Sequence, residues 1–499
     1  MLNKVTLAIM IGGFIPSVYA NSISVPEHSF ERDPIQTEVN PLSTVNANEL
    51  KEAQLRNQSL PSVKSQEQSV IRYTGKQLRE NPQILEKLFV DALIGQNKAV
   101  LPVYIQIYEL TPNPDHSLID WGNAILAKDK NVDKSVNLYR KLISHFPDNN
   151  FIRFQLAESL FINQEYEAAK DQFEKLRSSS VVMPQDIVVF DRYIEAINNR
   201  NKWNFSFGAR FLNDPNLGNS ADKGTTVTLP NGRVLSYDTE KESGKGLSLW
   251  FGVDKQWALS NGKYLITHLN TSSKYYWNNK KYNDVNAHFD FGMGYSTARF
   301  NIEFTPYIEQ RWYGGGLNGS NSLKRYTKTF GSLLSGSYWI TPTLKYSLFY
   351  NYGYEKYDKK LQSRLYDGVL HQITNSLMYF TSPRQYWNVS IDYINKDAKD
   401  KTNAYYRYGT RLTWGQEWPL GVSSSFTLGI AKRQYKDIFI FGNKQRNNEF
   451  SSSLSLWHKE FHYAGFTPRI TWNYTKTDSN IPIYSYDKSQ VFIEASRTF

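Results

Sequence analysis

The feature that most constrains the fold is a two-residue alternation of apolar and polar side chains that recurs through residues 203–499. In one segment, Phe289, Phe291 and Met293 alternate with His288 and Asp290. This period places the two sets on opposite faces of a β-strand. A soluble sandwich also alternates, so a single strand decides little. A long series of such strands with aromatic residues at their ends favours a membrane barrel.

The rest of the composition supports a barrel rather than a helical membrane protein. No segment after the N-terminus has the roughly 20 continuous apolar residues that a spanning helix needs. In lipid, only helices and closed barrels satisfy every backbone polar group. The 34 Tyr and 12 Trp residues suit the two membrane interfaces, where one end of an aromatic ring is wet. We therefore expect a transmembrane β-barrel in an outer membrane.

The alternating segments number fourteen, an even count of the kind that bacterial single-chain barrels have. Their connections alternate between short ones, such as 296–299, and long ones, such as 215–243. Short turns belong on the periplasmic side and long loops outside, so this phase places both the N-terminal part and Phe499 in the periplasm. The predicted strands begin near Trp203, Gly246, Tyr264, Val285, Phe300, Arg325, Thr343, Gly368, Trp387, Ala404, Ser423, Glu449, Phe466 and Lys488.

The N-terminal 70 residues divide into two parts. Residues 1–20 have the pattern of a secretory signal peptide, with Lys4, an apolar stretch at 7–15 and a small-x-small-like cleavage pattern ending at Ala20. Residues 21–70 are rich in Asn, Ser, Gln, Glu and Pro and are expected to be a flexible periplasmic segment. A segment that orders on a partner is the alternative. The chain has no cysteine, so we expect neither a lipid anchor on cysteine nor disulfides.

Residues 71–200 change to a helical period and contain an internal repeat. Pro114-Asp115 begins one unit and Pro147-Asp148 the next, and Tyr139 matches Phe173 at an offset of 34 residues. This is the spacing of tetratricopeptide (TPR) repeats. Two clear units rarely stand alone, so 88–110 is interpreted as a degenerate preceding unit and 186–198 as a capping helix.

Stacked helix pairs present a concave surface that suits a protein segment. Trp121, Asn123, Arg153 and Gln155 lie on the predicted first helices and are expected to face this surface as client-binding residues. The alternative for Trp121 is a place in the core.

Enzymatic chemistry is not indicated. None of the eight histidines falls in a recognisable zinc or nucleophile motif. His458 and His462 have metal-ligand spacing only for a helix, and they lie at a predicted strand end. His288 and Asp290 share a predicted lumen face, where an ionic network is the favoured interpretation over a catalytic dyad. We therefore expect no enzyme, no cofactor and no metal site.

The formal net charge of +11 does not indicate nucleic acid across this compartment. Contact of exterior lysines with outer-membrane lipid and anionic lipopolysaccharide explains the positive charge at least as well as binding of an acidic partner protein does. Charges of both signs are expected inside the barrel, where they either form ion pairs that stabilise the interior or line an aqueous path. The predicted lumen-lining residues are Arg210, Asp254, His288, Asp290, Glu303, Asp392, Arg407, Arg411, Arg469 and Glu494.

The α plus transmembrane β architecture, a periplasmic TPR-like helical domain followed by a 14-stranded antiparallel barrel, resembles the surface lipoprotein assembly modulator (Slam) family, the outer-membrane component of type XI secretion. The resemblance is carried by the repeats in 114–176, the direct passage at 198–203 and the strand ladder to Phe499. It implies an outer-membrane translocon that moves selected clients to the cell surface or the medium. The clients would be surface lipoproteins or haemophore-like soluble proteins used in host iron or haem acquisition.

The same resemblance implies periplasmic chaperones as further partners. The alternating C-terminal residues Val491, Ile493, Ala495 and Phe499 resemble the targeting signal that the barrel-assembly machinery reads, although Arg497 departs from it. Two other classes remain open from the sequence: a passive or solute-specific porin whose repeats are a docking domain, and a barrel enzyme, which the missing nucleophile–base signature disfavours.

Overall fold

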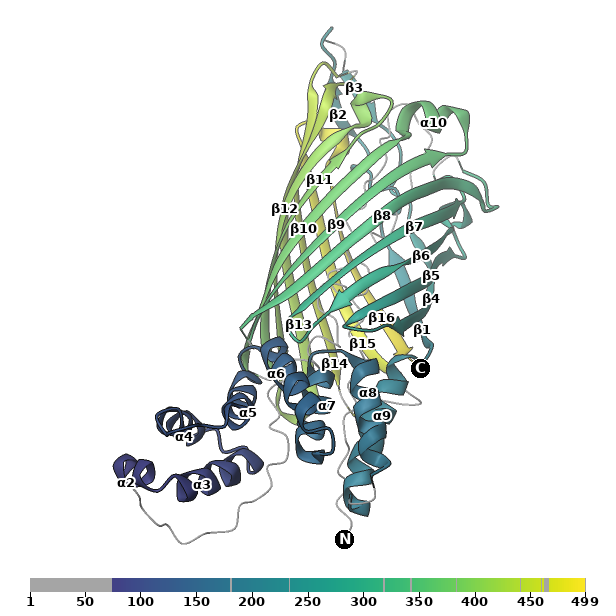
Figure 1. Ribbon diagram of the computed structural model, residues 1–499. Helices are drawn as coiled ribbons and strands as arrows, with labels where there is room; N and C mark the ends of the chain where they lie inside the picture. The colour runs from purple at the N-terminus through teal and green to yellow at the C-terminus, as the bar shows by residue number, and fades with distance from the viewer. Residues whose placement is uncertain are drawn as a thin grey trace.

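The structure is a computed structural model that describes residues 74–499, except for 180–181, 233, 317–318, 342, 383, 440, 459, 462–465 and 499. The predicted signal peptide at 1–20 and the predicted flexible segment at 21–70 lie outside the described residues, as do His462 and Phe499. The described chain has a helical part followed by a closed barrel (Figure 1).

The helical part is built from antiparallel helix pairs. Side-chain oxygens of Asp115, Asn131 and Asn149 accept hydrogen bonds from the first backbone N–H groups of three successive helices, which is why those helices begin there. The predicted repeat units correspond to α5–α6 and α7–α8. The helices are α2 (Gly75–Glu80), α3 (Pro82–Ile94), α4 (Leu101–Tyr108), α5 (His116–Ala127), α6 (Val132–His145), α7 (Asn150–Ile162), α8 (Tyr166–Arg177) and α9 (Pro184–Arg200).

Small and large side chains at equivalent repeat positions form the core of this helical domain. Ala124 and Ala157 are fully buried, as is Phe173, and Tyr139 is almost fully buried. Ser135 occupies the position that Ala169 occupies in the next repeat; it is fully buried, and its Oγ donates to the Ala124 carbonyl at 2.8 Å. A hydroxyl with a backbone partner therefore serves where a methyl group would otherwise pack. No helix among the described residues is long and apolar enough to cross a membrane.

The barrel closes in the order β1-β16-β15-β14-β13-β12-β11-β10-β9-β8-β7-β6-β5-β4, which confirms the predicted fourteen strands. Every neighbouring pair is antiparallel. The strands are β1 (Asn204–Asp214), β4 (Gly244–Ala258), β5 (Lys263–Tyr276), β6 (Asp284–Ser296), β7 (Phe300–Tyr313), β8 (Lys324–Thr341), β9 (Leu344–Tyr357), β10 (Gly368–Ser382), β11 (Gln385–Lys396), β12 (Tyr405–Glu417), β13 (Val422–Ile438), β14 (Lys444–His458), β15 (Thr467–Ser479) and β16 (Tyr486–Thr498).

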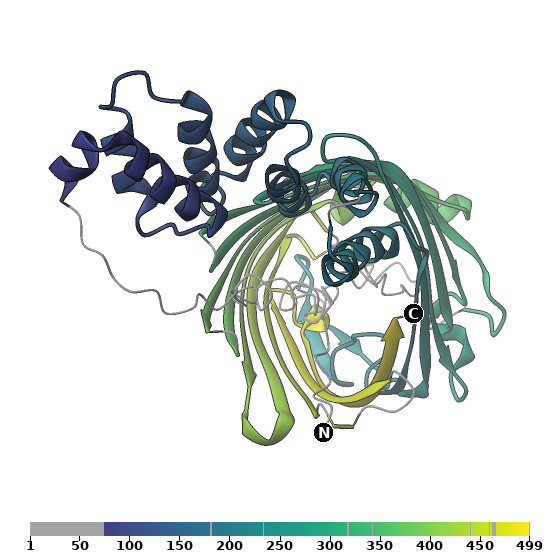
Figure 2. The same cartoon turned by 60° about the horizontal axis from the view of Figure 1, so that its bottom comes forward.

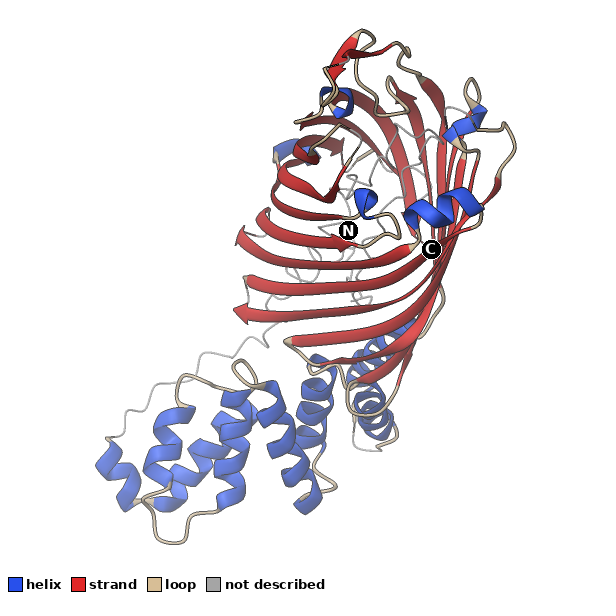
Figure 3. Ribbon diagram, turned by 90° about the horizontal axis from the view of Figure 1, so that it is seen from above, coloured by secondary structure: helices blue, strands red, loops and turns tan. Residues whose placement is uncertain are grey.

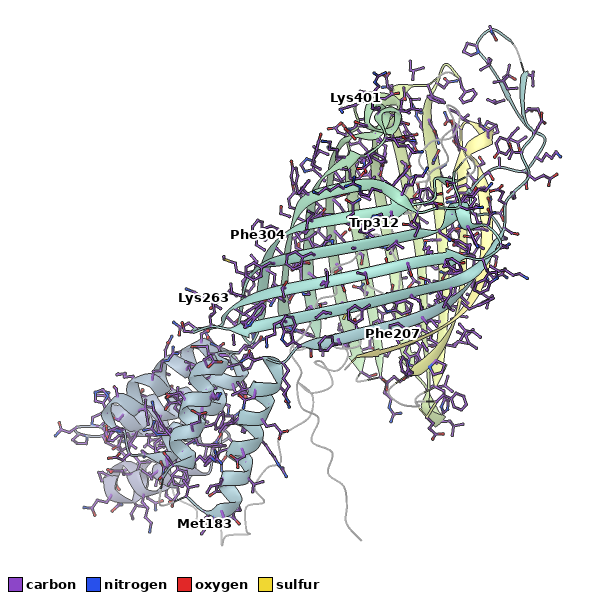
Figure 4. The ribbon with its side chains drawn as sticks, turned by 90° about the vertical axis from the view of Figure 1, so that its right-hand side faces the viewer. Met183, Phe207, Lys263, Phe304, Trp312 and Lys401 are labelled. Carbon is purple, nitrogen blue, oxygen red and sulfur yellow. The ribbon has the colours of Figure 1, made fainter. Side chains whose placement is uncertain are left out.

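The two faces of the wall differ as the alternation predicts. Phe289, Phe291 and Met293 are 47%, 48% and 63% exposed on the outside, whereas His288 and Asp290 are buried on the inside. The outer wall carries further aromatic residues such as those labelled in Figure 4. The barrel interior is therefore polar, and the apolar core of the chain is in the helical domain.

The sequence did not predict the elements at the end of the barrel opposite the helical domain. The first long connection contains a hairpin of β2 (Thr225–Thr228) and β3 (Val234–Tyr237), and another contains α10 (Lys360–Tyr366), as Figure 3 shows. Strand β14 begins at Lys444 rather than near Glu449. Residues 444–449 are all polar, so this part of the strand shows no alternation of apolar and polar side chains. The strand extends there beyond the lipid-facing apolar zone of the barrel.

Candidate functional site

A polar cluster occupies the lumen wall on β5, β6 and β7. Asp290 lies 2.7 Å from His268 Nδ1 and 3.2 Å from His288 Nε2. Glu309 lies 3.3 Å from the other ring nitrogen of His288. Asp254 is the register partner of His268 on β4. The imidazoles are thus held between carboxylates, an arrangement that stabilises the wall.

A second cluster lies nearer to the helical domain. The Tyr264 hydroxyl donates to Glu303 Oε1 at 2.6 Å, and Ser335 Oγ donates to Oε2 at 3.3 Å. Asn301 donates to the same tyrosine oxygen at 2.7 Å. Glu303 therefore ties β5, β7 and β8 together on the lumen side.

A third cluster spans β11 to β14 and is fully ionic. Arg407 donates to Asp392 Oδ2 at 2.6 Å and to Glu449 Oε2 at 2.8 Å. Arg433 lies 2.8 Å from Glu449, and Arg411 lies 3.2 Å from Asp392. Three guanidinium groups thus share two buried carboxylates, which leaves excess positive charge on this side of the lumen.

A fourth cluster joins the first and last strands of the barrel. Arg210 donates to Glu494 Oε2 at 2.7 Å, and Arg469 Nη1 lies 3.9 Å from Glu494 Oε1. With these three, all ten residues predicted to line the lumen occupy strand positions whose chain neighbours face outward. Their contact with a client stays a prediction.

Several partners in these clusters are missing from the sequence-based set. They are His268, Glu309, Arg433 and Glu449. Three of them lie next to an apolar residue of the outer face and could have been found by that alternation, whereas Arg433 lies between Lys432 and Gln434. The pairing of all four depends on the register between strands.

The helical domain gives a mixed result for the predicted client-binding residues. Trp121 and Gln155 are 6% and 2% exposed, and the indole N–H donates to Gln155 Oε1 at 3.0 Å. The Tyr139 hydroxyl donates to the same oxygen, and burial raises the pKa of this phenol. The prediction that Trp121 and Gln155 face an exposed concave surface is therefore wrong, and the core alternative for Trp121 is confirmed. Asn123 and Arg153 are only partly buried.

The helical domain is hydrogen-bonded to the barrel at the end with the short turns. In the turn between α7 and α8, Gln164 Nε2 donates to the Thr297 carbonyl at 2.6 Å, and Ser296 Oγ donates to Gln164 Oε1. The turn between β6 and β7 is thereby held against the repeats. Asn201, which follows α9, accepts from the Ala258 backbone N–H at 3.2 Å. Seen from this end, helices of the domain lie over part of the barrel opening (Figure 2).

The described part of the chain holds no group of three or more His, Cys, Asp or Glu side chains that could bind a metal ion. The His458 ring packs against Phe461 with 4.9 Å between centroids, and its Nδ1 accepts from the Glu460 backbone N–H. The predicted partner of His458 in a metal pair, His462, lies outside the described residues.

These features define an outer-membrane β-barrel with a periplasmic TPR-like domain docked at its mouth. Residues 203–499 match the family model for the surface lipoprotein assembly modifier, and residues 71–173 match the model for the N-terminal TPR repeats of the same family. The chain belongs to the surface lipoprotein assembly modifier family.

Three relatives illustrate the range of the family. The chain is 36% identical to surface lipoprotein assembly modifier 1 of Haemophilus influenzae, over 86% of this chain and 88% of that protein. It is 31% identical to surface lipoprotein assembly modifier 1 of Neisseria meningitidis, over 89% and 88% of the two chains. It is 21% identical to the hemophilin secretion modulator of Acinetobacter baumannii, over 85% and 87%.

Proposed function

We propose that this protein exports specific client proteins across the outer membrane, to the cell surface or into the medium. The helical domain would bind the client in the periplasm, and the barrel would provide the path. The names of the relatives support two client classes, surface lipoproteins and secreted proteins such as hemophilin. We propose that clients of both classes, the second haemophore-like, serve host iron or haem acquisition. Both would reach the domain through periplasmic chaperones, and catalysis has no part in the proposal.

One observation carries this proposal. The α7–α8 turn is hydrogen-bonded to the periplasmic turn of the barrel through Gln164. A segment bound to the repeats would therefore be held beside the lumen mouth and would not have to diffuse to it. Local capture of this kind raises the effective concentration of the client at the path.

The surface that would bind the client is narrower than the sequence predicts. Asn123 and Arg153 remain candidates because they are partly exposed. Arg153 donates to Gln172 at 2.8 Å, so its guanidinium is held in place on α7. Phe151, on the same helix, is 57% exposed, and Met183 is 60% exposed at the far tip of the domain (Figure 4). Exposed apolar side chains and a fixed cation on the same domain suit a client segment of mixed character.

The path would be lined by the ionic clusters described above. The periplasm supplies no nucleotide, so the driving force would come from folding of the client outside or from differences in binding along the path. Anionic lipopolysaccharide would contact exposed lysines at the exterior end, such as Lys401 (Figure 4), and the barrel-assembly machinery would insert the barrel.

Quantitative proteomics on a deletion strain tests the proposal, with surface-labelled proteins and culture supernatant measured separately. Loss of one lipoprotein from the surface, with its total amount retained, identifies a display client. Loss of one soluble protein from the medium identifies a secreted client. No client-specific change, together with altered solute uptake, would replace export with the porin alternative.

A deletion of 71–200 tests the role of the helical domain. The shortened barrel should still insert but should no longer export the client identified above. Asn123→Ala combined with Arg153→Ala should weaken client binding in full-length protein. Export at the wild-type level by the deletion variant would rule out capture by the repeats.

A further inference from the structure

The barrel closes through an unusually short strand ladder. Strands β1 and β16 pair from Ser206–Thr498 to Arg210–Glu494, which is five residue pairs. Strand β1 pairs with its other neighbour, β4, along its whole length. Among the described residues the β1–β16 register ends at Arg210–Glu494, so the opposing edges 211–214 and 490–493 continue beyond the ladder.

This part of the wall lies among side chains that face lipid. Phe211 is 44% exposed, and Val491 and Ile493 on the opposite edge are 55% and 57% exposed. Backbone N–H and C=O groups at membrane depth need hydrogen-bond partners. The edge of a strand that lacks a ladder is a template for another strand.

Side chains hold the two edges together where the ladder is missing. Lys488 Nζ lies 3.1 Å from Asp214 Oδ2, and both side chains are buried. Below them, the Arg210 guanidinium lies 4.3 Å from the centroid of the Phe492 ring and donates to Glu494. These lumen contacts can separate without disturbing the ladders that each strand makes with its other neighbour.

Apolar side chains from exterior connections form a second closure above the seam. Val227 of the β2–β3 hairpin packs in one buried cluster with Phe441 and Ile481. Val227 follows β1 in the chain and Ile481 precedes β16, so the cluster joins the exterior connections of the two seam strands. The seam is thus a region of weak backbone pairing between a short ladder and an apolar closure.

We propose that the seam between β1 and β16 is the docking site for an extended strand of the exported protein. This inference rests on the export function proposed above and names the part of the barrel wall that the client engages. The added strand would pair with the edges at 211–214 and 490–493. It would need apolar residues at alternate positions to match Phe211 and Ile493, and polar residues between them to face Asp214 and Lys488.

A reversible cross-link tests this site, because the chain contains no cysteine. Ala209 and Ala495 are directly opposite in the seam ladder, at a separation that suits a disulfide. Gly208 is unsuitable, since a Cβ there would lie 2.0 Å from the Trp250 ring. The matched control links the same β1 position to β4, as Ala209→Cys with Leu249→Cys, which are register partners in a complete ladder.

The expected result is specific to the seam. Oxidised A209C/A495C should insert normally but lower the surface amount of the client identified by the deletion strain about tenfold. Reduction should restore export, and the A209C/L249C control should export like wild type in both redox states. Wild-type export by the oxidised seam variant would overturn the docking site and leave the export function intact, whereas failure of the unmodified protein to export would overturn the function itself.

A photocrosslinking residue locates the contact directly. Placed at Val491 on the seam, it should cross-link to the same client. The matched position is Leu428, which also faces outward but lies on β13, a strand with long ladders on both sides. Equal cross-linking at both positions, or at Leu428 alone, would overturn the proposal, as would cross-linking at Val491 to a second copy of this chain in place of the client.

Discussion

Trp121 donates its indole N–H to Gln155 Oε1 at 3.0 Å, joining α5 to α7 inside the helical domain. The two residues lie on the first helices of successive repeats. Each repeat therefore contacts the next through its first helix. Because Tyr139 donates to the same oxygen, one glutamine connects three helices.

Replacing this acceptor should destabilise the helical domain. Gln155→Leu keeps the volume but leaves two buried donors without their acceptor, at about 1–3 kcal/mol each. We expect the free energy of unfolding of the domain to fall by roughly 2–6 kcal/mol. The measurement is chemical denaturation of the purified full-length protein, followed by the helical circular dichroism signal.

The control for this substitution is Gln106→Leu, on the exposed face of α4. It should change stability by less than about 0.5 kcal/mol. If the Gln155→Leu variant unfolds at the same denaturant concentration as the wild type, the shared acceptor does not stabilise the repeats.

The hydrogen bonds between the α7–α8 turn and the β6–β7 turn should fix the orientation of the helical domain relative to the barrel. Gln164 has a φ of 62°, so Gln164→Gly removes its side chain without adding backbone strain. We expect the domain to sample a wider range of positions, since the hydrogen bonds to Ser296 and Thr297 are lost. Spin labels at Met183→Cys and Lys263→Cys report this as a broader distance distribution.

Gln106→Ala in the same doubly labelled protein is the matched control and should leave the distribution unchanged. An unchanged distribution in Gln164→Gly would mean that the linker after α9, with Asn201 bonded to Ala258, is sufficient to hold the domain.

The sequence predicts the barrel strands well because the two-residue alternation of side chains is a local property of each strand. One face of each strand meets lipid and the other meets the lumen, so the alternation of residues such as Phe289 and Asp290 is sufficient to assign the faces. Pairing is not local. The contact of Asp290 with His268 depends on the register between β5 and β6, which no single strand encodes.

The predictions for the helical domain failed where a helix position has two roles. A position on a first helix can face a concave surface or the next repeat, and the repeat period in the sequence is the same for both. Trp121 and Gln155 face the next repeat and are buried. The β2–β3 hairpin was missed for a different reason: its strands have four residues each, too few for an alternating pattern to stand out.

The ionic cluster on β11 to β14 should be critical for barrel stability. Arg407→Met removes the cation between Asp392 and Glu449, whose side chains are 2% and 6% exposed. Breaking a buried pair by removing one partner costs about 3–5 kcal/mol. We expect the folded barrel to lose its resistance to urea, as measured by the heat-modifiable mobility of folded and unfolded forms in gels.

Arg325→Ala is the surface control for this charge removal. Its partner Asp358 is 3.4 Å away, and both side chains are exposed, so the loss should be less than about 1 kcal/mol. Equal urea resistance of the Arg407→Met and Arg325→Ala barrels would show that Arg433 and Arg411 compensate for the lost cation.

The exterior loop that contains α10 should loosen at acidic pH. Burial alone would raise the pKa of Asp367, but its hydrogen bonds from Lys399, Ser363 and the Tyr357 backbone N–H together hold the pKa below its usual value of 3.8. A carboxyl whose pKa is lowered in the folded state stabilises that state fully above the usual pKa, and this contribution is lost as the pH falls through the lowered value. Cleavage of the loop by pepsin should therefore accelerate as the pH falls below about 4. The rate is divided by the rate of pepsin on an unstructured peptide at the same pH, which removes the pH dependence of the protease itself.

The control is Asp367→Asn, which cannot ionise. Its loop should be cleaved faster than the wild-type loop at the upper end of this pH range and should show no further acceleration of opening as the pH falls. A wild-type loop that opens with the same pH dependence as the variant would mean that the ionised Asp367 does not hold α10 in place.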